Sequence, residues 1–282
     1  IKFLILFLGL MSLITSNEAF AQSGDTETFT GIEEIIVTAR KKEEPLQETP
    51  VTITALTDTK IQKLYATDLK DLGMSVPNLL INTNASGSFT NSAAVFMRGI
   101  GNSDIDSTID PPIGIFLDGV YVPRSSNSNL DLFDVEQVEV LRGPQGTLFG
   151  RNTTAGAIVV RSKRPTGEFG AKARLTMGDY GRRDLRVAVE APLSDTVNAK
   201  ISVLQQKSDG FYKARYQTHP DHSIPAQMSY NYEGDYEDTG GDDLFSVRPM
   251  LEFNPSETFK LTLIGEYSKD RSEPVPAINA AK

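Results

Sequence analysis

Residues 134–160, DVEQVEVLRGPQGTLFGRNTTAGAIVV, decide the fold of this chain. Valines alternate with polar side chains at the start of the stretch, and residues 157–160 form an apolar run, so each end predicts a strand. The connector between them contains Pro144, which restricts one φ angle, and glycines, which permit positive φ. We therefore expect a strand, a connector of specific shape, and a second strand.

A glycine-rich connector that follows a strand can also cradle a phosphate group. That chemistry requires a lysine and a hydroxyl at the start of a helix. No Gly-Lys-Ser or Gly-Lys-Thr follows here, and no helical pattern opens after Gly150. The connector is therefore interpreted as a structural element.

The run at residues 138–158, VEVLRGPQGTLFGRNTTAGAI, resembles the plug-domain signature of TonB-dependent outer-membrane receptors. The match is continuous and extends far beyond a chance glycine spacing. Ala155 stands where the family has the first of two adjacent glycines, a departure that concerns the local backbone and not the family. The resemblance assigns the signature to Gly99, Gly143, Pro144, Gly146, Gly150, Arg151 and Gly156.

The composition excludes a helical membrane protein but not a β-sheet one. The chain has 282 residues, of which 39% are hydrophobic, and a mean hydropathy of -0.25. Strands that alternate lipid-facing and lumen-facing residues average to such values. The net charge of -9 argues against a nucleic-acid partner. Without cysteine, the chain has no disulfide framework or thiolate zinc site.

Residues 1–21 predict a secretory signal peptide. Lys2 precedes an apolar core of about a dozen residues, which is too short to span a bilayer comfortably. Ala19 and Ala21 place small residues at a cleavage site, and an uncleaved anchor is the alternative. Because residue 1 is Ile rather than Met, we expect the sequence to be clipped at its start.

Residues 22–45 are expected to be a flexible segment that carries a short strand-forming peptide. Such a peptide can add itself to the edge of another protein's sheet through main-chain hydrogen bonds. It resembles the TonB box, which implies the C-terminal domain of periplasmic TonB as a partner. An ordinary first strand of the following domain is the alternative. The peptide consists of Glu34, Ile35, Ile36, Val37, Thr38 and Ala39.

Residues 46–165 are expected to form an α+β plug domain with a small mixed sheet and short helices. Residues 51–56 predict a strand, and Asp58 is placed at the N-cap of a helical segment that ends near Gly73. The buried face of that segment is assigned to Ile61, Leu64, Leu69 and Leu72. Further strands are predicted at residues 79–81, 95–97 and 113–117.

Two arginine-glycine pairs end strands of this domain, at Arg98 and Arg142. These arginines resemble the family residues that lock the plug to glutamates on the inner barrel wall, and a guanidinium suits such carboxylate pairing. We expect the partner glutamates to lie outside this chain; two surface arginines are the alternative. The apical loops supply candidate ligand contacts, which are otherwise plain surface residues: Phe89, Asn91, Asp104 and Asp106.

Residues 166–282 are expected to be the first strands of an antiparallel transmembrane β-barrel. Long segments alternate apolar residues with charged ones that a wet lumen accepts and lipid rejects. A soluble sandwich would also alternate, but tight turns at residues 193–195 and 254–256 contrast with the long polar loop 208–243. We count about five strands, whereas plugged transporters have about twenty-two, so we expect a fragment of a longer receptor.

We predict no catalytic group, no cofactor and no metal site. His219 and His222 lie in the long polar loop without a visible third ligand, so solvated histidines are favoured over a metal site. The acidic residues of that loop are expected to form a solvent-facing tip rather than a calcium site, because their oxygens lack a fixed scaffold. These residues are Glu233, Asp235, Glu237, Asp242 and Asp243.

The resemblance implies a receptor in the outer membrane of a Gram-negative bacterium, with lipid around the strands, the plug facing the periplasm and the long loops outside. It implies active uptake of a scarce ligand, most often a ferric siderophore, driven by the proton motive force through TonB. A passive channel or binding module uncoupled from TonB is the alternative, and the missing catalytic constellation disfavours a periplasmic enzyme. The same plug also serves receptors for vitamin B12, nickel complexes and oligosaccharides, so the ligand is not specified.

Overall fold

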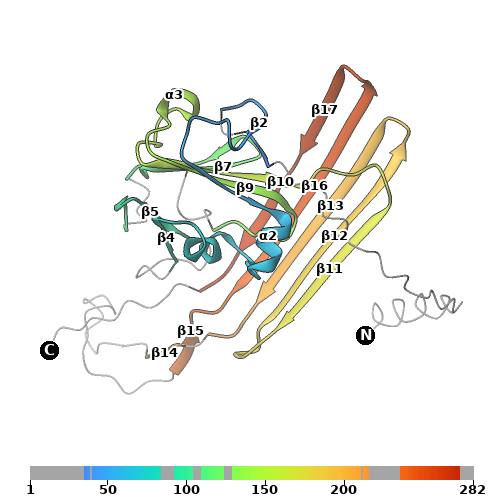
Figure 1. Ribbon diagram of the computed structural model, residues 1–282. Helices are drawn as coiled ribbons and strands as arrows, with labels where there is room; N and C mark the ends of the chain where they lie inside the picture. Colours follow the sequence, from blue (N-terminus) through green and yellow to red (C-terminus); the bar gives the residue numbers. More distant parts are fainter. Residues whose placement is uncertain are drawn as a thin grey trace, which may run out of the picture. The chain divides into compact units, whose positions relative to one another are not determined.

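The computed structural model describes residues 35–38, 40–83, 92–103, 109–123, 129–210, 212–215 and 236–273. They form an α+β domain followed by a sheet of long antiparallel strands, here named the long sheet (Figure 1). Both parts confirm the predicted fold class. No helix among these residues is long and apolar enough to cross a bilayer. The predicted signal peptide, residues 1–21, lies outside the described residues.

The α+β domain is built on a mixed five-stranded sheet with the order β3-β9-β10-β7-β8. β9 and β10 pair antiparallel with Val140 opposite Ile158, whereas β10 runs parallel to β7. The strand, connector and second strand are therefore confirmed, and the connector contains a short helix, α3 (Gly146–Phe149). The five strands are β3 (Ile53–Thr57), β7 (Ile113–Leu117), β8 (Val120–Val122), β9 (Val135–Arg142) and β10 (Gly156–Ser162).

Smaller elements complete the domain. They are β1 (Ile36–Val37), β2 (Glu44–Pro45), α2 (Asp58–Lys63), the 3-10 helix η2 (Leu69–Met74), β4 (Leu79–Asn82), β5 (Ala94–Met97) and β6 (Ile100–Gly101). Two predictions are wrong in detail. Asp58 is the first helical residue and Thr57 is the N-cap, since the chain is still extended at Thr57. Leu64 is 40% exposed rather than buried, because α2 ends one residue before it.

The central strands of the mixed sheet are buried on both faces. Val138, Val140 and Ile158 belong to the main core, where the sheet packs against α2, η2 and β4. Leu141 and Val159 face the opposite way and join a second cluster with Phe116. This second face is covered by Phe149 of α3 and by residues 36–38, which contact Gln137 and Glu139 on the same side of β9 as Leu141.

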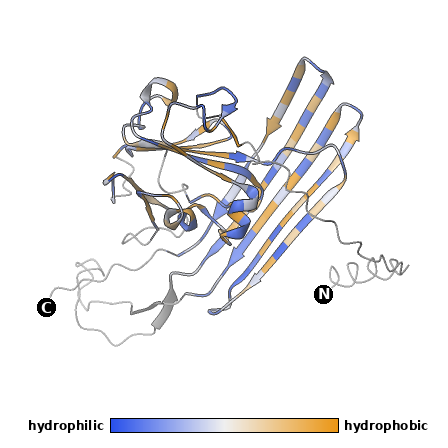
Figure 2. Cartoon of the chain, in the orientation of Figure 1, coloured by the Kyte–Doolittle hydropathy of each residue, from blue (hydrophilic) through white to orange (hydrophobic). Residues whose placement is uncertain are grey.

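The long sheet has the strand order β11-β12-β13-β16-β17, with β18 also paired to β16. Apolar and polar bands alternate along its strands in Figure 2, as the period of two predicts. Leu175, Met177 and Leu263 are exposed, at 61%, 72% and 57%. Its strands are β11 (Gly170–Met177), β12 (Arg183–Ser194), β13 (Val197–Lys207), β16 (Asp243–Ser256), β17 (Phe259–Ile264) and β18 (Tyr267–Asp270); a separate pair comprises β14 (Tyr212–Arg215) and β15 (Tyr236–Thr239).

Candidate functional site

The α+β domain contacts the polar face of the long sheet through a short segment, Asp131–Asp134, here named the strap. The strap directly precedes β9, so the main sheet of the domain fixes its position. Phe133 N–H donates to Asp131 Oδ1 at 2.9 Å, which stabilises the turn inside the strap. Because alternate residues of each long strand point to one face, a single strap can meet side chains from several strands.

The first contact is a buried ion-pair cluster around Arg186 of β12. Arg186 Nε donates to Asp131 Oδ2 at 2.7 Å, and its Nη1 donates to Asp184 Oδ2 at 3.3 Å. Arg182 Nη2 reaches the same Asp184 oxygen at 2.8 Å. The side chain of Arg186 is fully buried, so its charge depends on these carboxylates for compensation.

The second contact joins the other end of the strap to β13. Lys200 Nζ lies 2.6 Å from Asp134 Oδ1 and donates to the Lys163 carbonyl oxygen at 3.0 Å. Ser202 Oγ donates to the second carboxylate oxygen of Asp134 at 2.6 Å. From β11, Lys172 Nζ donates to the Phe133 carbonyl oxygen at 3.1 Å. Strands β11 and β13 of the long sheet thus both hold the strap.

A third contact starts from β10 and the turn between β7 and β8. Ser162 Oγ donates to Asp118 Oδ2 at 2.7 Å and accepts from Arg248 Nη1 of β16 at 2.9 Å. Arg248 Nη2 then donates to Glu266 Oε2 at 3.0 Å. This chain of hydrogen bonds connects the interior of the α+β domain to the neighbouring strands of the long sheet.

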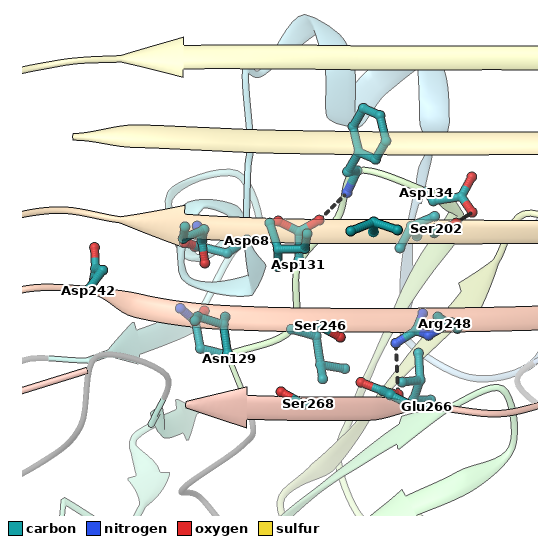
Figure 3. Close-up of a pocket in the computed structure, with 18 of the residues that line it drawn as sticks. Asp68, Asn129, Asp131, Asp134, Ser202, Asp242, Ser246, Arg248, Glu266 and Ser268 are labelled. Carbon is teal, nitrogen blue, oxygen red and sulfur yellow. Dashed lines mark hydrogen bonds and ion pairs between the residues drawn. The ribbon is translucent and has the colours of Figure 1, made fainter. Parts of the chain in front are cut away.

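A cavity of about 290 Å³ lies between the strap and β13, β16 and β18. In Figure 3, carboxylate, amide and hydroxyl side chains from both parts surround this space. Burial raises the pKa of Asp68 on this lining above its usual range, and neighbouring Asp71 and Asp131 act in the same direction against Lys70. The lining can hold water or polar groups, but it offers no catalytic nucleophile with an adjacent base.

Most signature glycines lie in the connector between β9 and β10, and Gly99 lies in the turn after β5. Gly143 and Gly150 have φ values of 106° and 80°, which side chains with a Cβ rarely adopt. Gly156 packs its Cα against Met97 and the Leu141 carbonyl group. Gly146 opens α3, and Gly99 has a φ of 79°. Pro144 and Arg151 form no ion pair or core contact among the described residues.

The two arginines predicted to lock the plug do not contact the long sheet in the described part of the chain. Arg142 donates from Nη2 to Thr54 Oγ1 at 3.0 Å and from Nη1 to the Pro77 carbonyl oxygen at 3.3 Å, both within the α+β domain. Its buried Nε atom has no hydrogen-bond partner there. Arg98 lies beside Gly143, and neither arginine pairs with a described glutamate. Their role as a latch stays a prediction.

The predicted TonB-box peptide is only partly described, because Glu34 and Ala39 lie outside the described residues. Ile35, Ile36, Val37 and Thr38 are packed on the α+β domain, and Val37 is fully buried. Within the segment 22–45, which is expected to be flexible, β1 pairs with β2. The ligand candidates Phe89, Asn91, Asp104 and Asp106, together with His219, His222, Glu233 and Asp235, lie outside the described residues.

The sequence reasoning missed the residues that join the two parts. It identified charged residues on the lumen face of the strands as a class, but not Arg186, Lys200 or their partners Asp131 and Asp134. The only signal was the alternation that places Arg186 and Lys200 on one face. The strap and these strands are far apart in the sequence, so their ion pairs can be identified only in the folded structure. Within the described residues, no group of His, Asp and Glu could hold a metal ion.

Comparison with known proteins agrees with this architecture. Residues 45–157 match the family described as TonB-dependent Receptor Plug Domain. The catecholate siderophore receptor Fiu of Escherichia coli K12 is 30% identical over 165 residues, which are 58% of this chain and 20% of Fiu. The ferrioxamine B receptor of Salmonella typhimurium LT2 is 25% identical over 177 residues, with 61% and 24% covered. The vitamin B12 transporter BtuB of Vibrio vulnificus is 26% identical over 177 residues, with 63% and 28% covered.

Solved structures show the same fold. The ferric yersiniabactin uptake receptor FyuA from Yersinia pestis superimposes with a TM-score of 0.62 at 22% identity, covering 77% of this chain and 31% of FyuA. The chain thus spans between 20% and 28% of the curated relatives described above. The family comprises transport receptors rather than enzymes, which supports the expected non-enzymatic role.

Proposed function

Since residues 45–157 match the family described as TonB-dependent Receptor Plug Domain, we propose that this chain belongs to an outer-membrane transporter for active uptake of a scarce ligand. The ligand class that the relatives favour is a ferric siderophore, because Fiu and the ferrioxamine B receptor are named for such ligands. Energy would come from the proton motive force through periplasmic TonB. The plug would face the periplasm, and the long loops would lie outside the cell.

The observation that carries this proposal is the contact between the plug domain and the long sheet. Buried ion pairs at Arg186 and Lys200 hold the plug on the polar face, while the opposite face exposes apolar residues such as Leu175 and Met177. An apolar outer face and a polar, plugged inner face are the features of a gated outer-membrane barrel. A gate of this kind stays closed until the plug moves.

The polar contacts also suggest how the gate could open. The cavity beside the strap already separates part of the plug from β13 and β16, and its lining mixes carboxylate and hydroxyl groups with apolar side chains. Displacing the plug would exchange ion pairs such as Lys200 with Asp134 for water, which a wet lumen can supply. A pull on residues 34–39 would act on the same domain, because that peptide packs against β9.

Uptake by iron-starved cells tests the proposal. Cells that produce the receptor should accumulate a radiolabelled ferric siderophore, and a protonophore should stop the accumulation. Val37→Pro should also stop it, because proline removes a main-chain donor from a strand-forming peptide. Gln47→Pro, at an exposed turn position, is the matched control.

Uptake that continues after the proton gradient is collapsed would contradict active transport and favour the passive channel or uncoupled binding module. Capture of the receptor by the purified C-terminal domain of TonB tests recognition by TonB separately from uptake of the ligand. Equal capture of the parent protein and Val37→Pro would contradict recognition of residues 34–39 by strand addition.

A further inference from the structure

The cavity beside the strap has an acidic end that both parts of the chain build. Asp68 comes from the plug, where an isolated β-bridge joins it to Asp131 of the strap. Asp242 comes from the long sheet, directly before β16. Both carboxylates act electrostatically on Arg182, so they lie at the same end of the cavity, where Figure 3 labels them. The plug and the long sheet thus each contribute one carboxylate to this end.

The charges on the lining leave Asp242 without an ion-pair partner. Three cations, Lys70, Arg182 and Arg248, are each paired with one carboxylate, at 3.0, 2.8 and 3.0 Å. The two strap carboxylates are compensated by the buried cations of β12 and β13. Among the described residues of the lining, no unpaired cation remains for the Asp242 carboxylate. The lining is therefore one positive charge short.

Asp68 contributes a buried oxygen without a hydrogen-bond partner. The residue is 8% exposed, and Lys70 Nζ lies 3.0 Å from its Oδ2 atom. Its Oδ1 atom has no partner among the described residues. A buried carboxylate oxygen that lacks a donor costs stability, and a bound donor removes that cost. The acidic end therefore offers a ligand both a charge and a vacant acceptor.

The rest of the lining suits an alkyl chain with a polar end. The volume of about 290 Å³ lies at the small end of ligand cavities. Hydroxyl groups come from Ser246 and Ser268, which stand opposite each other on β16 and β18. Apolar side chains come from both parts, among them Leu130 on the plug and Leu204 and Leu244 on the long sheet. Since no group of His, Asp and Glu in the described part of the chain could hold a metal ion, the missing charge points to an organic cation.

We propose that this cavity binds a primary alkylammonium group. The ammonium carries one charge and three donors, which match the Asp68 Oδ1 atom, the Asp242 carboxylate and a serine hydroxyl. The alkyl chain lies on the apolar side chains, and its burial adds to the affinity. An anionic group on the same chain would meet like charge. That the amine belongs to the transported ligand rests on the proposed function, whereas binding of the alkylammonium group does not.

Pentylammonium, pentanol and pentanoate test the site, because they share one alkyl chain and differ in charge. Saturation-transfer NMR with the purified receptor at neutral pH, measured against detergent micelles alone, should detect binding of pentylammonium. Asp242→Asn and Asp68→Asn keep the side-chain size and should each weaken this binding about tenfold or more, since hydrogen bonds to a charged acceptor are among the stronger ones. Asp243→Asn is the matched control, because Asp243 lies 3.6 Å from Arg271 and outside this lining.

Equal binding of pentylammonium by the parent protein and Asp242→Asn would overturn the site. Pentanol bound as tightly as pentylammonium would also overturn it, because the apolar side chains alone would then explain the affinity. Asp242→Asn keeps the test valid if Asp68→Asn does not fold, since the Asp242 carboxylate has no ion pair to lose among the described residues.

Uptake tests whether the site serves the transported ligand. Iron-starved cells should take up a linear ferric trihydroxamate with a terminal amine, and Asp242→Asn should raise its half-saturating concentration about tenfold. The same complex with its amine acetylated should not distinguish the parent protein from Asp242→Asn. Equal half-saturating concentrations for the amine complex would overturn the assignment of the amine to the transported ligand. Failure of both complexes to enter would contradict the proposed function, while the NMR titration still decides the site.

Discussion

Arg186 of β12 and Asp131 of the strap form an ion pair of 2.7 Å in which the arginine side chain is fully buried. Fifty-five residues separate them in the sequence, and they belong to different parts of the fold. Arg186 also reaches Asp184 at 3.3 Å on its own strand. The pair therefore joins the plug to the long sheet, and removing Arg186 would leave the Asp131 carboxylate without its ion-pair partner.

Arg186→Ala should weaken the contact between the plug and the long sheet by about 3–5 kcal/mol, the usual effect of breaking a buried ion pair. We expect a lower melting temperature for the receptor in detergent by calorimetry. Arg183→Ala, at an exposed position on the same strand, should leave the melting temperature nearly unchanged. Equal melting temperatures for Arg186→Ala and the parent protein would show that the ion pair does not hold the plug.

Lys200 and Asp134 should be energetically coupled. A double-mutant cycle with Lys200→Met and Asp134→Asn is expected to give a coupling of about 1–3 kcal/mol, because Lys200 is buried and the atoms lie 2.6 Å apart. Arg161 and Glu136 form a more exposed pair at 3.4 Å and serve as the comparison cycle. That cycle should give at most about 1 kcal/mol. Similar couplings for both pairs would contradict a special role for the strap.

Gly156→Ala should destabilise the plug by about 1–3 kcal/mol, a typical cost of overpacking a core. An added Cβ would collide with the Met97 side chain and with the Leu141 carbonyl oxygen on the paired strand. Gly146→Ala is the control, because a Cβ there meets no atom within 4 Å. Denaturant unfolding should place Gly146→Ala near the parent protein and Gly156→Ala well below it; the reverse order would refute the packing argument.

Asp68 should make the stability of the plug depend on pH. Burial raises the pKa of its folded form above the usual 3.8, so the native state binds this proton more tightly than the unfolded state. The resulting stabilisation is complete below the unfolded pKa and is lost as pH rises through the folded pKa. Asp68→Asn cannot ionise and should lack this loss.

Unfolding free energies of the parent protein and Asp68→Asn, measured at several pH values, provide the check. The difference should favour Asp68→Asn increasingly as pH rises above 3.8. At lower pH both side chains are neutral, so the difference should become constant there, which is the internal control. Lys70, Asp71 and Asp131 are the charged groups that act on Asp68. A difference independent of pH would contradict the raised pKa.

Local sequence determined which elements form and which family the plug resembles. The alternation at residues 134–142, the glycine connector and the apolar run after Gly156 predict β9, a connector of specific shape and β10 in order, but not the short helix α3 inside the connector. Period-two patterns likewise predict the strands of the long sheet. These features depend on a few neighbouring residues, so one sequence is sufficient to recognise them. The helix start at Asp58 and the burial of Leu64 were wrong because helix ends depend on contacts outside the local pattern.

Only the tertiary structure decided which polar residues work together. The alternating pattern places Gln137 and Glu139 on the solvent side of a strand, yet both are buried because residues 36–38 cover that face of β9. Likewise, Arg186 and Lys200 meet Asp131 and Asp134 only after the long sheet lies against the plug. Periodicity specifies the face on which a side chain stands. The partner on that face depends on how distant segments pack, and no local pattern encodes that arrangement.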